Sequence, residues 1–241
     1  MKYLDMLEKL GVIGAHPGGM GKTRKLIKAA NIPPGCKILE AGCGAGETAC
    51  YLASAGFEVT ALDNRPRFLQ IAKERADMMD VTVNWVEADL ENMPFPPDSF
   101  DAVLAESVTL FANIQNAFDE YFRVLKPGGV LADCEIVLKQ DIPQAMAQQI
   151  TDFMDLDGLY KVGEWIQFME NSGFVVKQPV ERTELWDPDQ FAEGQKVDTS
   201  LFLDSAVSQA AAMYFELMIS NFHHFQYGMF IGKKLDVKKK I

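Results

Sequence analysis

The stretch Leu39-Glu40-Ala41-Gly42-Cys43-Gly44-Ala45-Gly46-Glu47 decides the fold. Residues 37–41 read as a short apolar strand and residues 47–55 as a helix, so the three glycines occupy a strand-to-helix turn. Glycines at such a turn let the backbone bend sharply and approach a ligand closely, and the helix that follows presents free amide groups. The spacing therefore predicts a ligand-binding loop at the end of the first strand of a sheet.

The ligand predicted for this loop is a nucleoside without phosphates. A dinucleotide fingerprint, Gly-x-Gly-x-x-Gly, would need a glycine at position 47, where Glu47 stands and would repel a pyrophosphate. Asp63 ends the next apolar run, 21 residues after Gly42. An acid at this place accepts hydrogen bonds from ribose hydroxyls. The alternative for Asp63 is an ordinary surface turn that precedes a helix.

Outward from this loop, short apolar runs alternate with amphipathic stretches. The strands expected are 37–41, 57–62, 81–86, 100–105, 130–134, 174–176 and 227–231, and the helices expected are 23–30, 47–55, 67–78, 114–125, 162–172 and 204–221. Strands separated by helices indicate right-handed βαβ units and a mostly parallel, doubly wound α/β sheet of seven strands. About 45 residues separate the last two strands, which is too many for a plain connection. An inserted cap is expected there.

Composition and charge exclude several classes of protein. The 241 residues include 34 Asp+Glu and 23 Lys+Arg, a net charge of −11. This leaves few basic side chains for a surface that binds nucleic-acid phosphates. No stretch approaches the roughly 20 apolar residues of a membrane span. The first residues include Asp5 and Glu8, unlike a secretory signal. The four cysteines match neither zinc nor redox spacing, so free thiols in the cytoplasm are expected.

Four motifs in order carry a resemblance to a known family. They are Glu40-Ala41-Gly42-Cys43-Gly44-Ala45-Gly46, Leu62-Asp63, Ala88-Asp89-Leu90 with Met93 to Asp101 behind it, and Arg123-Val124-Leu125-Lys126-Pro127-Gly128-Gly129. With them the chain resembles the class I S-adenosylmethionine-dependent methyltransferases, in their small-molecule (methyltransferase type 11-like) branch. The resemblance covers residues 12–135 well and the remainder in architecture. It implies a Rossmann-like fold with S-adenosylmethionine as cofactor and S-adenosylhomocysteine as product.

The resemblance also implies roles for individual residues. Glu40 would lie beneath the methionine moiety, with Gly42, Gly44 and Gly46 wrapping the cofactor. Asp63 would hold the ribose, Asn64 would lie beside the adenine, Asp89 would accept from the adenine amino group and Leu90 would cover the ring. Glu106 would line the methionine end. One domain is expected over 1–241: an N-terminal helical lid (1–36), a cofactor-binding half (37–136) and a substrate half (137–241) with its cap at about 181–225.

The segment His16-Pro17-Gly18-Gly19-Met20-Gly21-Lys22-Thr23 permits two interpretations. It resembles a deviant phosphate-binding loop, but the ordinary pattern needs a glycine at position 16 and a core strand before the loop. The alternative binds no nucleotide: the segment is either part of the lid, in which Gly19 approaches the cofactor carboxylate and Thr23 hydrogen-bonds it, or a simple helix cap.

Methyl transfer from a sulfonium is an in-line displacement, so the protein supplies alignment and, where needed, a base. The candidates are His16, Glu106 and Glu135, the last placed just past the fifth strand. The motif that methylates amino groups of nucleic-acid bases is absent after the fourth strand, where Ala105-Glu106-Ser107-Val108 stands. A small-molecule acceptor is therefore expected, with no nucleic acid, membrane or metal. The alternatives are a catalytically silent cofactor-binding scaffold and a nucleotide-binding protein.

Overall fold

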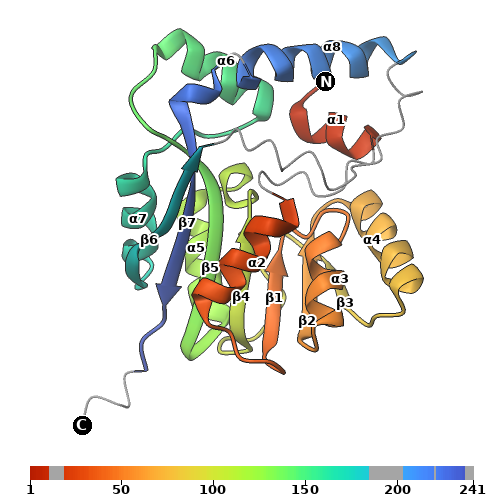
Figure 1. Cartoon of the computed structure of the whole chain (residues 1–241), viewed down its shortest axis with the longest axis vertical. Helices are drawn as coiled ribbons and strands as arrows, with labels where there is room; N and C mark the ends of the chain where they lie inside the picture. Colours follow the sequence, from red (N-terminus) through yellow and green to blue (C-terminus); the bar gives the residue numbers. More distant parts are fainter. Residues whose placement is uncertain (11–18, 185–202, 220, 237–241) are drawn as a thin grey trace.

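A computed structural model describes residues 1–10, 19–184, 203–219 and 221–236. Its centre is a seven-stranded sheet in the order β3-β2-β1-β4-β5-β7-β6 (Figure 1). The strands are β1 (Lys37–Ala41), β2 (Glu58–Asp63), β3 (Asn84–Glu87), β4 (Phe100–Glu106), β5 (Leu125–Leu138), β6 (Val175–Glu184) and β7 (Phe225–Lys233). Strand β7 runs antiparallel to β5 and β6, and the other pairs are parallel. The predicted Rossmann-like methyltransferase fold is confirmed.

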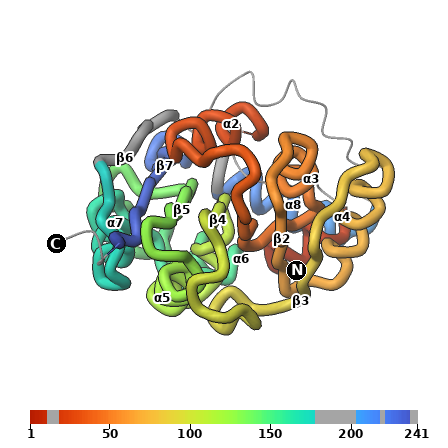
Figure 2. Tube along the Cα trace, turned by 90° about the horizontal axis from the view of Figure 1, so that it is seen from below, coloured from red at the N-terminus to blue at the C-terminus, as the bar shows by residue number. Residues whose placement is uncertain are grey.

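Helices cover both faces of the sheet. They are α1 (Tyr3–Leu10), α2 (Gly19–Ala30), α3 (Glu47–Ser54), α4 (Pro66–Met79), α5 (Ile114–Val124), α6 (Gln144–Met154), α7 (Val162–Asn171) and α8 (Ser205–Tyr214). Helices α5 and α7 lie on one face, while α2, α3 and α4 lie on the other (Figure 2). The neighbours Ile38 and Leu39 of β1 belong to different core clusters because adjacent strand residues point to opposite faces. This explains why the strands read as continuous apolar runs.

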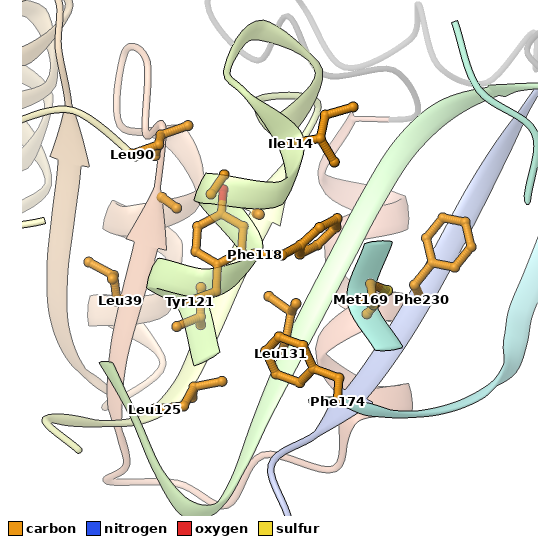
Figure 3. Close-up of a cluster of buried hydrophobic side chains, with 14 of the residues drawn as sticks. Leu39, Leu90, Ile114, Phe118, Tyr121, Leu125, Leu131, Met169, Phe174 and Phe230 are labelled. Carbon is orange, nitrogen blue, oxygen red and sulfur yellow. The ribbon is translucent and has the colours of Figure 1, made fainter. Parts of the chain in front are cut away.

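The larger core cluster lies under α5 (Figure 3). Phe118 and Tyr121 of α5 are fully buried against Leu131 of β5, and their spacing places them on one side of the helix. Asn113 begins the helix, because its side chain accepts a hydrogen bond from the amide of Asn116. Burial of each large apolar side chain contributes about 1.5–3 kcal/mol, so this face fixes the position of β4 and β5.

Three helices form a layer above the carboxyl ends of the strands. Helices α1, α6 and α8 pack together there, with Tyr3, Leu7, Phe153 and Val207 in a third core cluster (Figure 1). No helix in the described ranges is long and apolar enough to cross a membrane.

Several elements differ from the sequence predictions. Helices α1 and α6 were not expected; α6 shows its apolar face mainly in its second half, at Ile150, Phe153 and Met154. The predicted helix 204–221 ends at Tyr214 and continues as a π-helical turn (Phe215–Ile219). Strand β6 extends to Glu184 instead of ending at residue 176, so the connection to β7 begins at residue 185.

Candidate active site

A cavity of about 380 Å³ lies between the carboxyl ends of the strands and the layer of α1, α6 and α8. Its wall contains nine residues that the sequence singled out, which are Glu40, Gly42, Gly44, Asp63, Asn64, Asp89, Leu90, Glu106 and Glu135. Gly19, Thr23 and Gly46 are not in the wall. His16 lies outside the described residues. The topology therefore brings most of the predicted site together in one place.

The glycine loop has a backbone that only glycine adopts readily. Gly42, Gly44 and Gly46 have φ values of +66°, +50° and +74°. A Cβ added at Gly42 would overlap Val108, and one at Gly46 would lie 2.7 Å from Ala72 Cβ and 2.8 Å from Trp85, whereas one at Gly44 would meet nothing within 4 Å. Gly46 thus fits the loop against α4 and β3, and its contact with the cofactor stays a prediction.

Asp63 ties this loop to the turn after β2. Its Oδ2 accepts a hydrogen bond from the amide of Gly44 at 2.8 Å, and its Oδ1 accepts one from the amide of Arg65 at 2.9 Å. Burial raises the pKa of Asp63, and the two backbone hydrogen bonds oppose that rise. Each carboxylate oxygen keeps a further lone pair. Asp63 can therefore hold the loop and still accept hydrogen bonds from a ligand.

Helix α1 closes one side of the cavity; the sequence analysis expected a helical lid over residues 1–36 but did not single out this helix. Tyr3, Leu4, Asp5 and Leu7 line the wall. Arg65, which follows the Asp63 turn, forms ion pairs with Asp5 at 3.1 Å and with Glu8 at 2.7 Å. The signal was present in the sequence, since the buried residues Tyr3, Met6, Leu7 and Leu10 recur at helical spacing.

Glu106, at the end of β4, is held by two hydroxyl groups. Its Oε1 accepts a hydrogen bond from Thr23 Oγ1 at 2.8 Å, and its Oε2 accepts one from Thr48 Oγ1 at 3.1 Å. Thr23 is fully buried behind the wall, and Gly19 begins α2 outside it. In this structure the hydroxyl of Thr23 bonds to Glu106, and the contacts of Gly19 and Thr23 with the cofactor stay predictions.

Glu40 presents an unsatisfied carboxyl oxygen in the wall. The residue is buried, and its Oε2 has no hydrogen-bond partner among the residues that the structure describes. Burial raises the pKa of Glu40, and the carboxylates of Glu106 and Asp63 raise it further. A ligand that carries hydroxyl groups, an amino group and a positive charge would satisfy these acids, which is the chemistry of S-adenosylmethionine. The residues present fit that cofactor.

Glu135 lies inside β5 rather than just past the fifth strand, which corrects its predicted position. It is fully buried, and its Oε1 accepts hydrogen bonds from the amides of Val108 and Thr109, each at 2.8 Å. Its Oε2 has no partner in the described part of the chain. Burial raises the pKa of Glu135, and the neighbouring Asp133 adds to the rise. Burial that disfavours the ionised carboxylate makes Glu135 a poor candidate for a general base.

The lysine of the phosphate-loop interpretation is buried. Lys22 is 4% exposed, and its Nζ lies 3.9 Å above the centre of the Tyr227 ring in β7. A phosphate-loop lysine must reach the nucleotide, and this one points into the protein beneath α2. The residues that precede it, 11–18, lie outside the described part.

Known proteins resemble the chain in sequence and in fold. A family model described as a methyltransferase domain matches residues 39–133. A relative of Bacillus subtilis named as an uncharacterized methyltransferase, YodH, is 34% identical over 234 residues, which is 97% of this chain and 99% of the relative. The (4+2)-cyclase SpnF has the same fold, with a TM-score of 0.75, 21% identity, and coverage of 92% of this chain and 85% of its own.

A second solved structure is phosphoethanolamine N-methyltransferase 2 of Haemonchus contortus in complex with S-adenosyl-L-methionine. It superposes with a TM-score of 0.75 at 19% identity, over 91% of this chain and 54% of its own. The chain belongs to the class I S-adenosylmethionine-dependent methyltransferases. It is an enzyme of that class, and S-adenosylmethionine is its cofactor.

Proposed function

We propose that the chain transfers a methyl group in line to a small-molecule acceptor bound in the cavity beneath α1. The observation that carries the proposal is the coupling of Asp63 to Gly44, because it joins the acid after β2 to the glycine loop in one wall. The wall also holds Glu40 with its unsatisfied oxygen. Together these groups suit a ligand with hydroxyl groups and a positive charge.

Different residues of the wall would contact different parts of the cofactor. Asp63 would accept the ribose hydroxyls, Asp89 the adenine amino group, and Glu40 the amino group of the methionine moiety. Asn64 and Leu90 would flank the adenine ring. S-adenosylmethionine, when bound, supplies a methyl group made electrophilic by its sulfonium. Gly44 leaves room for it, since no side chain occupies that part of the wall.

The chain's contribution to the chemical step is alignment and exclusion of water. Glu106 is fixed by Thr23 and Thr48, so it provides a stationary negative charge and is not free to turn toward an acceptor. Glu135 is buried, with a raised pKa. We therefore propose no strong base from either carboxyl. His16 stays a prediction from the sequence, as do the cytoplasmic location and the absence of a nucleic-acid partner.

The lid and the acceptor complete the proposal. Helix α1 covers the cavity, and among the described residues side-chain contacts such as Arg65 with Glu8 join it to the turn of Asp63, so it is the element proposed to open. The cavity is enclosed by α1, α6 and α8, which favours a small molecule over a polymer.

The test is a binding titration with S-adenosylhomocysteine followed by a screen for labelled methyl transfer to pooled metabolites. Asp63→Ala should weaken cofactor binding by about 2–4 kcal/mol, roughly 30- to 1000-fold, because charged hydrogen bonds to the ribose and the anchor of Gly44 are lost together. Asp77→Ala, an exposed acid on α4, is the matched control and should bind normally. Binding by Asp63→Ala within about threefold of wild type would contradict the assigned cofactor site.

A further inference from the structure

A wall of stacked aromatic rings lines the cavity away from the glycine loop. The ring of Tyr3 in α1 lies 5.2 Å from that of Tyr214 in α8, at 17°, and 6.1 Å from that of Phe111, at 15°. Phe111 belongs to the 3-10 turn η1 (Thr109–Phe111) after β4. The apolar side chains of Ile136 and Met154 continue this wall. Flat aromatic surfaces of this kind pack well against a planar ring.

Glu135 lies at the border between this wall and the cofactor half. Its Oε1 receives the amides of Val108 and Thr109, the residues that lead into η1 and Phe111. The side chain of Val108 packs directly against Gly42 of the glycine loop, because a Cβ at Gly42 would overlap it. The preceding residue, Ser107, has a φ of +54°, so the chain turns sharply here. Glu135 thus contacts the segment that connects the cofactor loop, through Val108, to Phe111 of the aromatic wall.

The second oxygen of Glu135 lacks a partner. Oε2 is buried in a fully buried residue that lines the cavity, and no described group bonds to it. A buried polar atom without a partner destabilises the protein, so a ligand group that bonds to it removes that cost. Because Oε1 receives two amides, the proton of a neutral carboxyl resides on Oε2. Oε2 can therefore accept a hydrogen bond from a ligand in either protonation state, and it can also donate one when the carboxyl is neutral.

The charges of the wall restrict the ligand further. The described lining residues include two cations, and both are ion-paired: Lys2 with Asp155 at 3.2 Å, and Arg65 with Asp5 and Glu8. An anionic acceptor would find carboxyl groups and no unpaired cation in that wall. A cationic acceptor would be repelled by the sulfonium of the donor, which must come within reach of it.

We infer that the acceptor subsite lies between Glu135 Oε2 and the aromatic wall of Tyr3, Phe111 and Tyr214, and that it takes an uncharged, planar, apolar molecule whose hydroxyl or amino group bonds to Glu135. The inference rests on the proposed function, because it assigns the acceptor half of the same cavity.

The probes for this subsite are N-phenyl-1-naphthylamine and 8-anilinonaphthalene-1-sulfonate, which share one skeleton and differ by a sulfonate. Each is titrated by fluorescence into the protein saturated with S-adenosylhomocysteine. The neutral amine should bind at least about tenfold more tightly than the sulfonate. Phe111→Ala should weaken binding of the amine at least about tenfold, whereas Phe215→Ala, at a 65% exposed phenylalanine outside the wall, should leave it within about twofold.

Glu135→Gln tests the polar contact. Glutamine keeps the oxygen that receives the amides of Val108 and Thr109, but it places an amide donor where Oε2 stood, opposite the donor of the probe. Binding of the neutral amine should fall at least about fivefold, while S-adenosylhomocysteine binds within about threefold of wild type. Equal binding of both probes, an insensitive Phe111→Ala, or an unchanged Glu135→Gln would overturn the inference. If the wild-type protein did not bind S-adenosylhomocysteine at all, the proposed function would be overturned instead.

Discussion

Alanine at Gly46 should cost mainly stability and alanine at Gly44 mainly cofactor affinity, although both residues have a left-handed backbone conformation. Their φ values are +50° and +74°, in the left-handed region, where a non-glycine residue costs about 1–2 kcal/mol. At Gly46 the new methyl group would also press on Ala72 and Trp85 at 2.7 and 2.8 Å. Overpacking adds about 1–3 kcal/mol. Gly46→Ala should therefore lose about 2–5 kcal/mol of stability, and Gly44→Ala about 1–2 kcal/mol.

In thermal unfolding, these losses correspond to about 2–4 °C per kcal/mol for a domain of this size. The midpoint of Gly46→Ala should fall by roughly 4–20 °C, and that of Gly44→Ala by roughly 2–8 °C. Affinity should follow the reverse order, because the methyl group at Gly44 projects into the open wall of the cavity. Calorimetric titration with S-adenosylhomocysteine should show at least about a tenfold loss, or 1.4 kcal/mol, for Gly44→Ala. Folded Gly46→Ala should bind within about threefold of wild type.

Gly56→Ala is the control for backbone strain alone. Its φ is +85°, a Cβ there meets nothing within 4 Å, and the residue lies outside the cavity wall. It should lose stability as Gly44→Ala does and bind S-adenosylhomocysteine normally. If Gly44→Ala bound as well as Gly56→Ala, or if Gly46→Ala lost as much affinity as Gly44→Ala, the division of the loop into a cavity residue and a packing residue would be wrong.

Three further predictions concern buried charges and the lid. Burial raises the pKa of Asp133 from 3.8 to about 7, so stability should fall as the pH rises from about 4 to about 7 and change little above that. Asp133→Asn, which can still accept from Trp165 Nε1, should flatten that fall in thermal unfolding scans, and an unchanged pH profile would contradict the prediction. Arg65→Gln removes the ion pairs of α1, so it should weaken S-adenosylhomocysteine binding by roughly two- to fivefold. It should also speed amide hydrogen exchange across Tyr3–Leu10. Equal exchange in the variant and the wild type would show that these pairs do not hold the helix. Lys22→Met should leave the affinity for S-adenosylhomocysteine within about twofold of wild type, because the Lys22 side chain lies over Tyr227 and not in the cavity. ATP binding by the wild type that this variant lacks would support the phosphate-loop interpretation.

The parts of the site that the sequence predicts are those that a local turn determines. Gly42 and Gly44 follow a strand and precede a helix, and Asp63 ends the next strand, so each is marked by its immediate neighbours. Because parallel strands place their carboxyl ends at one edge of the sheet, the sequence alone predicts that these residues lie close together.

The parts that the sequence does not predict depend on long-range packing. Gly46 belongs to the same motif as Gly44, but Ala72 and Trp85 fill the space where a Cβ of Gly46 would lie, so this position packs against the protein. Thr23 donates to Glu106, 83 residues away, and no local pattern records that pair. Glu135 was placed beyond a strand that in fact continues to Leu138, because β7 pairs with it along its whole second half.

Strand β7 has a consequence for the order in which the chain can fold during synthesis. It is the last strand in the sequence, yet it lies inside the sheet between β5 and β6. On the ribosome, residues 37–138 emerge before β6 and β7, and they contain five adjacent strands with the glycine loop and Asp63. Strand β6 emerges next and finds no partner, while the edge of β5 stays open to other chains. The cofactor half can thus form early, but the nascent protein has an aggregation-prone edge until residues 225–233 arrive.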